Sequence, residues 1–254
     1  MPTVLLIRGA TGDGGRFDTL ARRLAGEFTI VVYDRPSGGG GHFPAGWQTT
    51  SPEEEADEAA NLLEKAEAGP AVVFGTGSDA NLALCLLIRH PGRVRGAVLH
   101  DPALYGLFDD PGAVRASLRE LVHGATEPGG PPAGMERFWR YATGDDAWTK
   151  LLPGLRERLQ ASCGTLFGVE LGSRYLPDDD LATRAPPVLL LVSHERLPFF
   201  AEMAGRLSER LRVEVTIKAT DHTAYHGPPG ELAEAVRPFL REAGAPCLAS
   251  AAAA

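Results

Sequence analysis

The chain has 254 residues, of which 44% are hydrophobic, and its 33 acidic and 25 basic residues give a net charge of -8. This length suits one α/β domain with an insertion, and the negative charge argues against nucleic acid and anionic membrane surfaces as partners. Cys85, Cys163 and Cys247 are widely spaced and fit neither a disulfide framework nor a metal site, which favours a reducing cytoplasm. We therefore expect no metal and no cofactor, and no apolar run is long enough to span a membrane.

The first third of the chain alternates short apolar runs with helical patterns. Val4–Ile7 and Phe28–Tyr33 indicate buried strands, and Phe17–Leu24 indicates an amphipathic helix between them. The glycine-rich segment 37–42 lacks the lysine and the glycine spacing of phosphate-binding loops, so we interpret it as a mobile loop near a pocket.

The next helix has a clear start signal. Ser51 suits the N-cap, Pro52 the first turn and Glu54 the capping-box position, which predicts a helix that continues to about Ala66. The acidic residues of this helix are interpreted as a solvated outer face.

The most informative stretch follows at residues 70–94. Ala71–Phe74 indicates a buried strand, Gly75-Thr76-Gly77 a sharp turn and Asp79–Arg89 an apolar helix that ends at His90-Pro91. A strand, a tight glycine turn and an immediate helix are typical of a nucleophile elbow, G-x-nucleophile-x-G.

On these residues the chain resembles the α/β-hydrolase family, and the resemblance covers nearly all of it. In that family a His-Pro pair follows the nucleophile at a set spacing, and counting back from His90-Pro91 leads to Gly77, which has no attacking atom. Asp79 stands where the family has a small residue, and together with Gly77 and Ser78 it is a candidate for contact with the substrate or its oxyanion. The resemblance implies that the Ser78 amide and the loop at Arg8-Gly9 supply the oxyanion hole. Glycine adopts a strained turn without steric cost, so the elbow can persist without its nucleophile.

Two polar positions keep two interpretations each. Arg8 replaces the family's usual histidine and either holds an anionic or enolate oxygen or forms an ion pair with a protein carboxylate. Asp101 follows the strand Gly96–His100 and is either the orienting acid, as in some family members, or the cap of a turn at Pro102.

Residues 103–184 break the strand–helix rhythm and predict a helical cap that supplies apolar pocket walls. Phe138 and Trp139 are candidate substrate contacts, although a single aromatic residue in such a helix more often belongs to the core. The predicted organisation is an α/β-hydrolase core at 1–102 and 185–243, a mostly parallel sheet flanked by helices, with the cap at 103–184 and a disordered tail at 244–254.

The last third resumes the sheet. Pro187–Val192 indicates a strand, and Glu195 in the loop after it is the second candidate acid, or else part of a surface ion pair. Val213–Ile217 indicates the last strand, and Glu231–Leu240 the last helix. His222 lies between them, where the resemblance implies the catalytic histidine.

Three functional hypotheses follow. The favoured one is an enzyme of specialised metabolism that uses His222 as a general base, with Asp101 ahead of Glu195 as its acid. It would act on a small hydrophobic carbonyl compound, polyketide-like or aromatic, by elimination, cyclisation, isomerisation, C–C cleavage or cofactor-free oxygenation. The second is an ordinary hydrolase that uses Ser78 or an activated water, and the third is a non-catalytic small-molecule-binding protein. The expected partner is a small hydrophobic substrate, with a homodimer left open.

Overall fold

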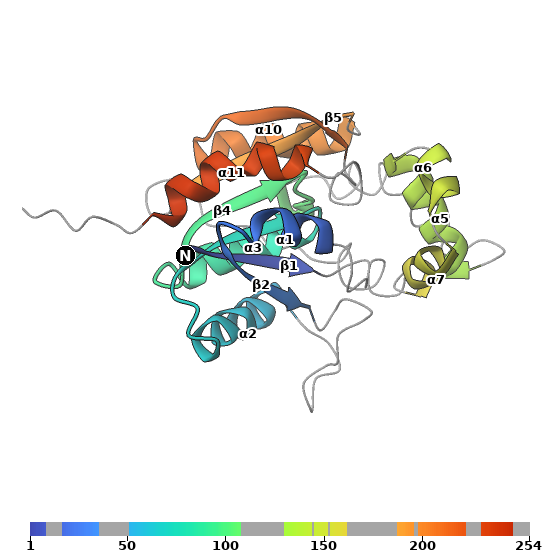
Figure 1. Cartoon of the computed structure of the whole chain (residues 1–254). Coiled ribbons are helices and arrows are strands. Elements are labelled where there is room, and N and C mark those ends of the chain that lie inside the picture. The colour runs from blue at the N-terminus through green and yellow to red at the C-terminus, as the bar shows by residue number, and fades with distance from the viewer. Residues whose placement is uncertain are drawn as a thin grey trace, which may run out of the picture.

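A computed structural model describes residues 1–8, 17–35, 51–107, 130–143, 145–151, 153–161, 187–195, 198–221 and 230–245 (Figure 1). The glycine-rich segment 37–42, Gly9, His222 and most of the tail lie outside these residues. The described strands form one parallel sheet in the order β2-β1-β3-β4-β5-β6, which confirms the predicted fold class. The strands are β1 (Thr3–Arg8), β2 (Thr29–Asp34), β3 (Ala71–Thr76), β4 (Val94–His100), β5 (Val188–Glu195) and β6 (Val215–Asp221).

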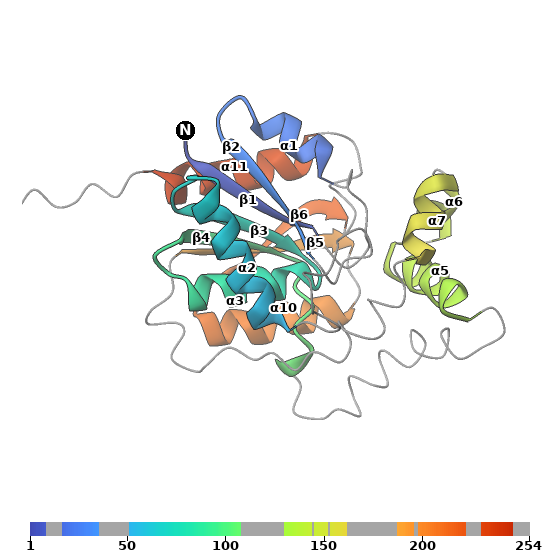
Figure 2. The same cartoon turned by 90° about the horizontal axis from the view of Figure 1, so that it is seen from below.

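Helices cover both faces of this sheet (Figure 2). The core on one face includes side chains of α2, α3 and α10, and the core on the other includes side chains of α1 and α11. The described helices are α1 (Asp18–Leu24), α2 (Pro52–Lys65), α3 (Asp79–Arg89), α5 (Gly130–Thr143), α6 (Asp145–Lys150), α7 (Pro153–Ala161), α10 (Pro198–Leu211) and α11 (Glu231–Gly244), and a short 3₁₀ helix, η1, spans Tyr105–Leu107.

The apolar runs of the sequence are explained by burial on both faces of the sheet. Successive side chains of a strand point to opposite faces. Leu5 and Ile7 therefore join the core with α2, α3 and α10, while Val4 and Leu6 join the core with α1 and α11. A strand covered on both faces needs a continuous apolar run rather than an alternating one.

The predicted start of α2 is confirmed in detail. The Ser51 hydroxyl accepts a hydrogen bond from the Glu54 amide at 3.2 Å, and the Glu54 carboxylate accepts one from the Ser51 amide at 2.9 Å. The interpretation of the acidic residues as a solvated face is wrong for Glu55, which is 0% exposed and has an ion-pair partner inside the protein.

Two strands differ from the predicted bounds. The strand predicted at Pro187–Val192 continues to Glu195, and the last strand runs from Val215 to Asp221 instead of ending at Ile217. The reason is backbone pairing between β5 and β6, which continues to the pair Glu195 and Asp221 after a register shift. Because this pairing does not depend on side-chain hydrophobicity, the apolar run underestimates the strand. Glu195 is therefore the last residue of a strand and does not lie in the loop after it.

The described part of the predicted cap is helical. Helices α5, α6 and α7 lie together beyond the carboxyl ends of the strands, on the right in Figure 1. Trp139, Trp148 and Leu159 are buried there, with 3%, 2% and 0% of their surface exposed. The boundaries of a separate cap at 103–184 stay a prediction.

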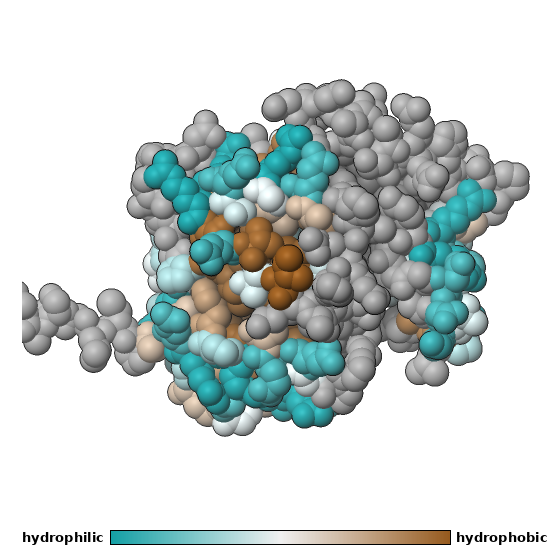
Figure 3. All heavy atoms as spheres, turned by 90° about the horizontal axis from the view of Figure 1, so that it is seen from above, coloured by the Kyte–Doolittle hydropathy of each residue, from teal (hydrophilic) through white to brown (hydrophobic). Residues whose placement is uncertain are grey.

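Strand β6 forms one edge of the sheet, and its Ile217 is 52% exposed. Figure 3 shows the molecule from above relative to Figure 1, with hydrophobic residues gathered on this face and hydrophilic residues around them.

The structure describes a single chain, and the homodimer left open in the sequence analysis stays open. None of the described helices combines the length and the apolar character needed to cross a bilayer.

Candidate active site

The candidate site lies at the edge of the sheet where the parallel strands end. In open α/β sheets, ligands bind at the carboxyl ends of the strands. Here β3 leads into Gly77, β4 into Asp101 and β6 into His222. The residues that end the strands at this edge are Arg8, Asp34, Thr76, His100, Glu195 and Asp221.

Gly77 forms the apex of the turn between β3 and α3. Its φ of 58° lies in the left-handed region, where other L-residues are strained. Its amide donates to the His100 carbonyl at 3.0 Å, and its carbonyl accepts from the Ala103 amide at 3.0 Å. A Cβ on Gly75 would lie 2.3 Å from the Asp79 carbonyl oxygen, so the strand and the helix meet too closely for a side chain there. The predicted strand and helix are thus present, but β3 continues through Gly75 and Thr76, so the turn lies at Gly77-Ser78 and not at Gly75-Thr76-Gly77.

Ser78 directly follows the apex and begins α3. Its φ of -69° and ψ of -24° are helical, its side chain makes no capping hydrogen bond, and the residue is 8% exposed. No residue in the described part of the chain accepts a hydrogen bond from the Ser78 amide. An amide at a helix N-terminus that is not engaged elsewhere can donate to an anionic oxygen. This is what the predicted oxyanion role of Ser78 requires.

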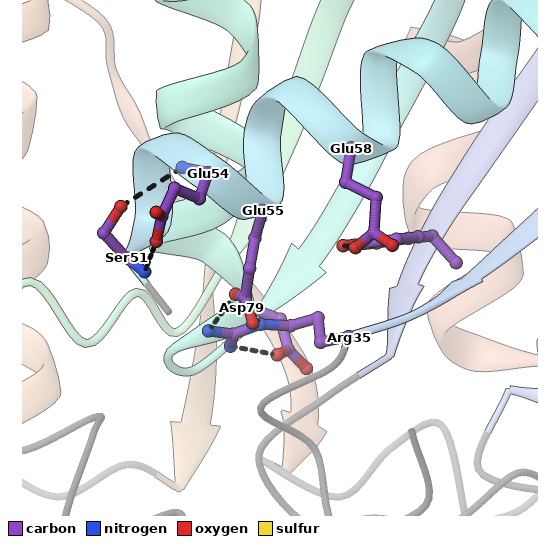
Figure 4. A network of polar contacts seen from close by, with 7 residues as sticks. Arg35, Ser51, Glu54, Glu55, Glu58 and Asp79 are labelled. Carbon is purple, nitrogen blue, oxygen red and sulfur yellow. Dashed lines mark hydrogen bonds and ion pairs between the residues drawn. The ribbon is translucent and has the colours of Figure 1, made fainter. Parts of the chain in front are cut away.

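Asp79 belongs to a buried ion triad beside the elbow (Figure 4). The Arg35 guanidinium lies 2.9 Å from the Asp79 carboxylate and 2.7 Å from the Glu55 carboxylate. The three residues are at most 3% exposed. Arg35 follows β2, Glu55 lies in the first turn of α2 and Asp79 starts α3, so the triad ties the elbow to two other elements. The structure gives Asp79 this partner inside the protein, and a substrate contact of Asp79 stays a prediction.

A buried tyrosine extends this polar region. The Tyr33 hydroxyl donates to Glu58, which is labelled beside the triad in Figure 4. Burial, this hydrogen bond and the negative charge of Glu55 raise the pKa of Tyr33 far above its usual value. Tyr33 therefore stays protonated and acts as a donor, not as a base.

Arg8 forms an ion pair with Asp34, its register partner on β2. Two guanidinium nitrogens of Arg8 contact the two carboxylate oxygens of Asp34, and the two side chains are 15% and 51% exposed. Of the two interpretations given above, the ion pair is therefore the one present in the structure. A substrate contact of Arg8, and the oxyanion role of the neighbouring Gly9, stay predictions.

Asp101 is held by the neighbouring strand β5. The Ser193 amide donates to one carboxylate oxygen at 2.8 Å, and the Ser193 hydroxyl donates to the other at 2.5 Å. Asp101 is 0% exposed and has a φ of 40°, unusual for a residue with a side chain. These hydrogen bonds run to β5 and not to the turn at Pro102, so they do not fit the turn-cap interpretation. Pairing between Asp101 and His222 stays a prediction.

His100 connects this carboxylate to the elbow strand. Its Nε2 lies 3.1 Å from the Ser193 hydroxyl and 3.5 Å from the Asp101 carboxylate, and its Nδ1 lies 3.0 Å from the Thr76 hydroxyl. Serine, histidine and aspartate meet here, but Ser193 is 0% exposed and donates its hydroxyl hydrogen to Asp101. This cluster is therefore not a nucleophile with its base.

The sequence analysis missed five of these residues: Arg35, Glu55, Thr76, His100 and Ser193. The local signal in the sequence was that these polar residues lie near the ends of predicted strands or in the first turn of α2. The carboxyl ends of the strands are where ligands bind in open α/β sheets. Of the remaining predicted residues, Trp139 is buried, whereas the side chains of Phe138 and Glu195 lie outside the description. Their roles, and that of Trp139 as a substrate contact, stay predictions.

Comparison with known proteins gives one family. Residues 4–235 match the profile of the Alpha/beta hydrolase family. The uncharacterised hydrolase YraK of Bacillus subtilis (strain 168) is 37% identical over 107 residues, which are 42% of this chain and 40% of YraK. The match thus spans less than half the length of this curated relative.

Solved structures resemble the chain over almost its full length. An esterase from Thermogutta terrifontis has a TM-score of 0.73 at 21% identity and covers 96% of this chain and 91% of its own. A hydrolase from Oleispira antarctica has a TM-score of 0.76 at 17% identity, with 95% and 91% covered. At these sequence identities the structural similarity supports the fold alone.

Proposed function

Because this chain belongs to the alpha/beta hydrolase family, we propose that it hydrolyses an ester or a similar acyl compound through a water activated by His222. No serine acyl-enzyme forms in this scheme. The family profile and the hydrolase name of YraK support the reaction class. The main observation in favour of a reaction without a serine nucleophile is that a glycine, Gly77, lies at the apex of the elbow.

The backbone geometry of the turn supports Gly77 as the apex residue. A nucleophile elbow holds its nucleophile in a strained strand-to-helix turn. Gly77 is the residue of this turn with a positive φ, whereas Ser78 has helical dihedrals one position later. The side chain of Ser78 therefore leaves the backbone in a different direction from that of an apex residue.

The proposed reaction balances without a covalent intermediate. His222 takes a proton from water as the water oxygen bonds to the carbonyl carbon. The Ser78 amide stabilises the negative oxygen of the tetrahedral intermediate. The bond to the leaving group then breaks, and His222 returns its proton to the departing oxygen. The products are an acid and an alcohol.

The same glycine also supports a second candidate. A base and an oxyanion donor without a nucleophile suit proton abstraction from a carbon next to a carbonyl, the first step of elimination, cyclisation or isomerisation. Turnover in H₂¹⁸O separates the two candidates, because hydrolysis places one ¹⁸O atom in the acid product. Proton abstraction instead exchanges hydrogen at carbon, which mass spectrometry in D₂O detects.

A fluorophosphonate probe tests the absence of a serine nucleophile. We expect the protein to hydrolyse short aryl esters while Ser78 remains unlabelled, because the hydroxyl of Ser78 is not at the apex. The Ser78→Ala variant keeps the amide and should lose less than about tenfold in turnover, which is below the about 10²–10⁴-fold that the loss of a general catalyst costs. Stoichiometric labelling that maps to Ser78 by peptide mass spectrometry would show that Ser78 is the nucleophile.

Restoring a hydroxyl at the apex tests the register of the elbow. We expect Gly77→Ser to react with the same fluorophosphonate at position 77, because the turn then presents an oxygen beside the base. The left-handed φ adds strain of about 1–2 kcal/mol, which the fold can tolerate. Asp79 is left unchanged because it pairs with Arg35. The Gly77→Ala variant is the matched control and stays unlabelled. A folded Gly77→Ser protein without labelling would refute the assignment of Gly77 to the nucleophile position.

A further inference from the structure

We propose that Ser193 and His100 are positioning residues that fix the carboxylate of Asp101, so that Asp101 can orient the catalytic base. This inference rests on the proposed function, because the base is His222. It assigns a role to a buried cluster of four polar side chains at the ends of β3, β4 and β5: Thr76, His100, Asp101 and Ser193.

The backbone of Asp101 is strained and held in place by its neighbours. A residue with a side chain at a φ of 40° costs about 1–2 kcal/mol and persists only when its surroundings hold it. The Asp101 amide donates to the Leu191 carbonyl at 2.9 Å, and the carboxylate accepts two hydrogen bonds from Ser193. Strand β5 therefore fixes both the backbone and the side chain of Asp101. Strain of this kind gathers at functional sites, where it presets a geometry.

The hydrogen bonds of the cluster run in one direction, toward the carboxylate of Asp101. The Ser193 hydroxyl has one hydrogen, and its 2.5 Å distance to Asp101 is typical of donation to an ionised carboxylate. Ser193 must then accept from His100, so the His100 Nε2 carries a hydrogen. The chain of donors runs from His100 through Ser193 to Asp101. Each donor favours the ionised form of the carboxylate, which is the form an orienting acid needs.

His100 also links the cluster to the elbow. Thr76 hydrogen-bonds Nδ1 of His100 and immediately precedes Gly77. The His100 carbonyl accepts from the Gly77 amide at 3.0 Å. Residue 100 thus contacts the elbow through its backbone and the acid through its side chain. Residue 100 therefore contributes to the relative position of the apex and Asp101.

The polar cluster is fully buried. His100, Asp101 and Ser193 are each 0% exposed, in a sheet whose other buried side chains are mostly apolar. Apolar side chains of similar volume stabilise such a position as well as a buried polar cluster does, or better. A need for stability alone therefore does not account for these residue types. A fixed carboxylate at the edge where ligands bind accounts for them.

Steady-state kinetics on an ester substrate test the inference. We expect Ser193→Ala to lower kcat about 10- to 100-fold with KM nearly unchanged, because Asp101 loses a charge-assisted hydrogen bond. Ser193→Thr should recover most of the loss. In the Asp101→Asn background, Ser193→Ala should add little, because the two residues act as a unit. The control is Ser208→Ala, which removes a partly buried hydrogen bond from the Ser208 hydroxyl on α10 to the Val213 carbonyl and should leave kcat unchanged.

A spectroscopic readout does not depend on substrate. In ¹⁵N-histidine NMR, we expect Nε2 of His100 to be protonated. The His100 signal is assigned by its absence from the spectrum of His100→Gln. We expect this signal to change in Ser193→Ala. A His100 protonated at Nδ1 alone would overturn the inference. Full activity of folded Ser193→Ala, together with an inactive His222→Ala variant, would also overturn the inference. The proposed function would stand in that case. Undiminished turnover in His222→Ala would remove the proposed function and this inference with it.

Discussion

Replacing Arg35 with alanine is expected to lower the free energy of unfolding by about 3–5 kcal/mol. Arg35 is the cation shared by Glu55 and Asp79, which are 0% and 1% exposed. Without the guanidinium, two buried carboxylates face each other's charge at the start of α2 and of α3. Each must then be hydrated or protonated, and both processes disrupt the packing around the elbow.

Urea unfolding at pH 7 measures this effect, with Arg89→Ala as the matched control. Arg89 forms an ion pair with Asp57 at 2.8 Å, but the side chains of the two residues are 41% and 46% exposed. Solvent screening limits the contribution of such a pair to less than about 1 kcal/mol. Equal losses in the two variants would contradict the structural role of the buried triad.

The exposed pair also has a defined pH dependence. The hydrogen bond from Arg89 lowers the pKa of Asp57 below its usual value. A lowered pKa means that the contribution of the pair is fully present above the unfolded pKa of about 3.9 and is lost as the pH falls through the folded pKa. The difference between wild type and Arg89→Ala should therefore vanish in strong acid.

The elbow was predictable because its signals are local. Ala71–Phe74 is a continuous apolar run, Gly75 lies where a Cβ has no room, and the helix of Asp79–Arg89 starts at the predicted residue. Burial on both faces of a parallel sheet imposes the apolar run, and the tight turn imposes the glycines. These constraints act on neighbouring residues and can therefore be recognised in the sequence.

The buried clusters were not predictable because their members are distant in the sequence. Arg35 and Asp79 are 44 residues apart, and His100 and Ser193 are 93 apart. A charged residue in a first helical turn, such as Glu55, looks the same in the sequence whether it faces water or a buried arginine. Only the sheet order, which places β3, β4 and β5 side by side, brings Thr76, His100 and Ser193 together.

The second large effect concerns His222. We expect His222→Ala to lower kcat about 10²–10⁴-fold, the usual contribution of a general base, while substrate binding remains. Asp101→Asn should cost less, because an amide still occupies the site but favours the wrong tautomer of the histidine. Glu195→Gln should cost little, because Glu195 ends a strand and is ranked second as the acid. A larger loss in Glu195→Gln than in Asp101→Asn would assign the acid to β5.

The most direct test of the account is chemical rescue of His222→Ala by free imidazole, followed as kcat on an aryl ester. A general base that activates water can be replaced in part by a diffusible base, because no covalent bond to the protein is needed. The account predicts a loss of about 10²–10⁴-fold in this variant, with kcat rising as imidazole is added and no covalent acyl group on the protein during turnover. Undiminished turnover in His222→Ala without imidazole, or an acyl group trapped on Ser78, would contradict it.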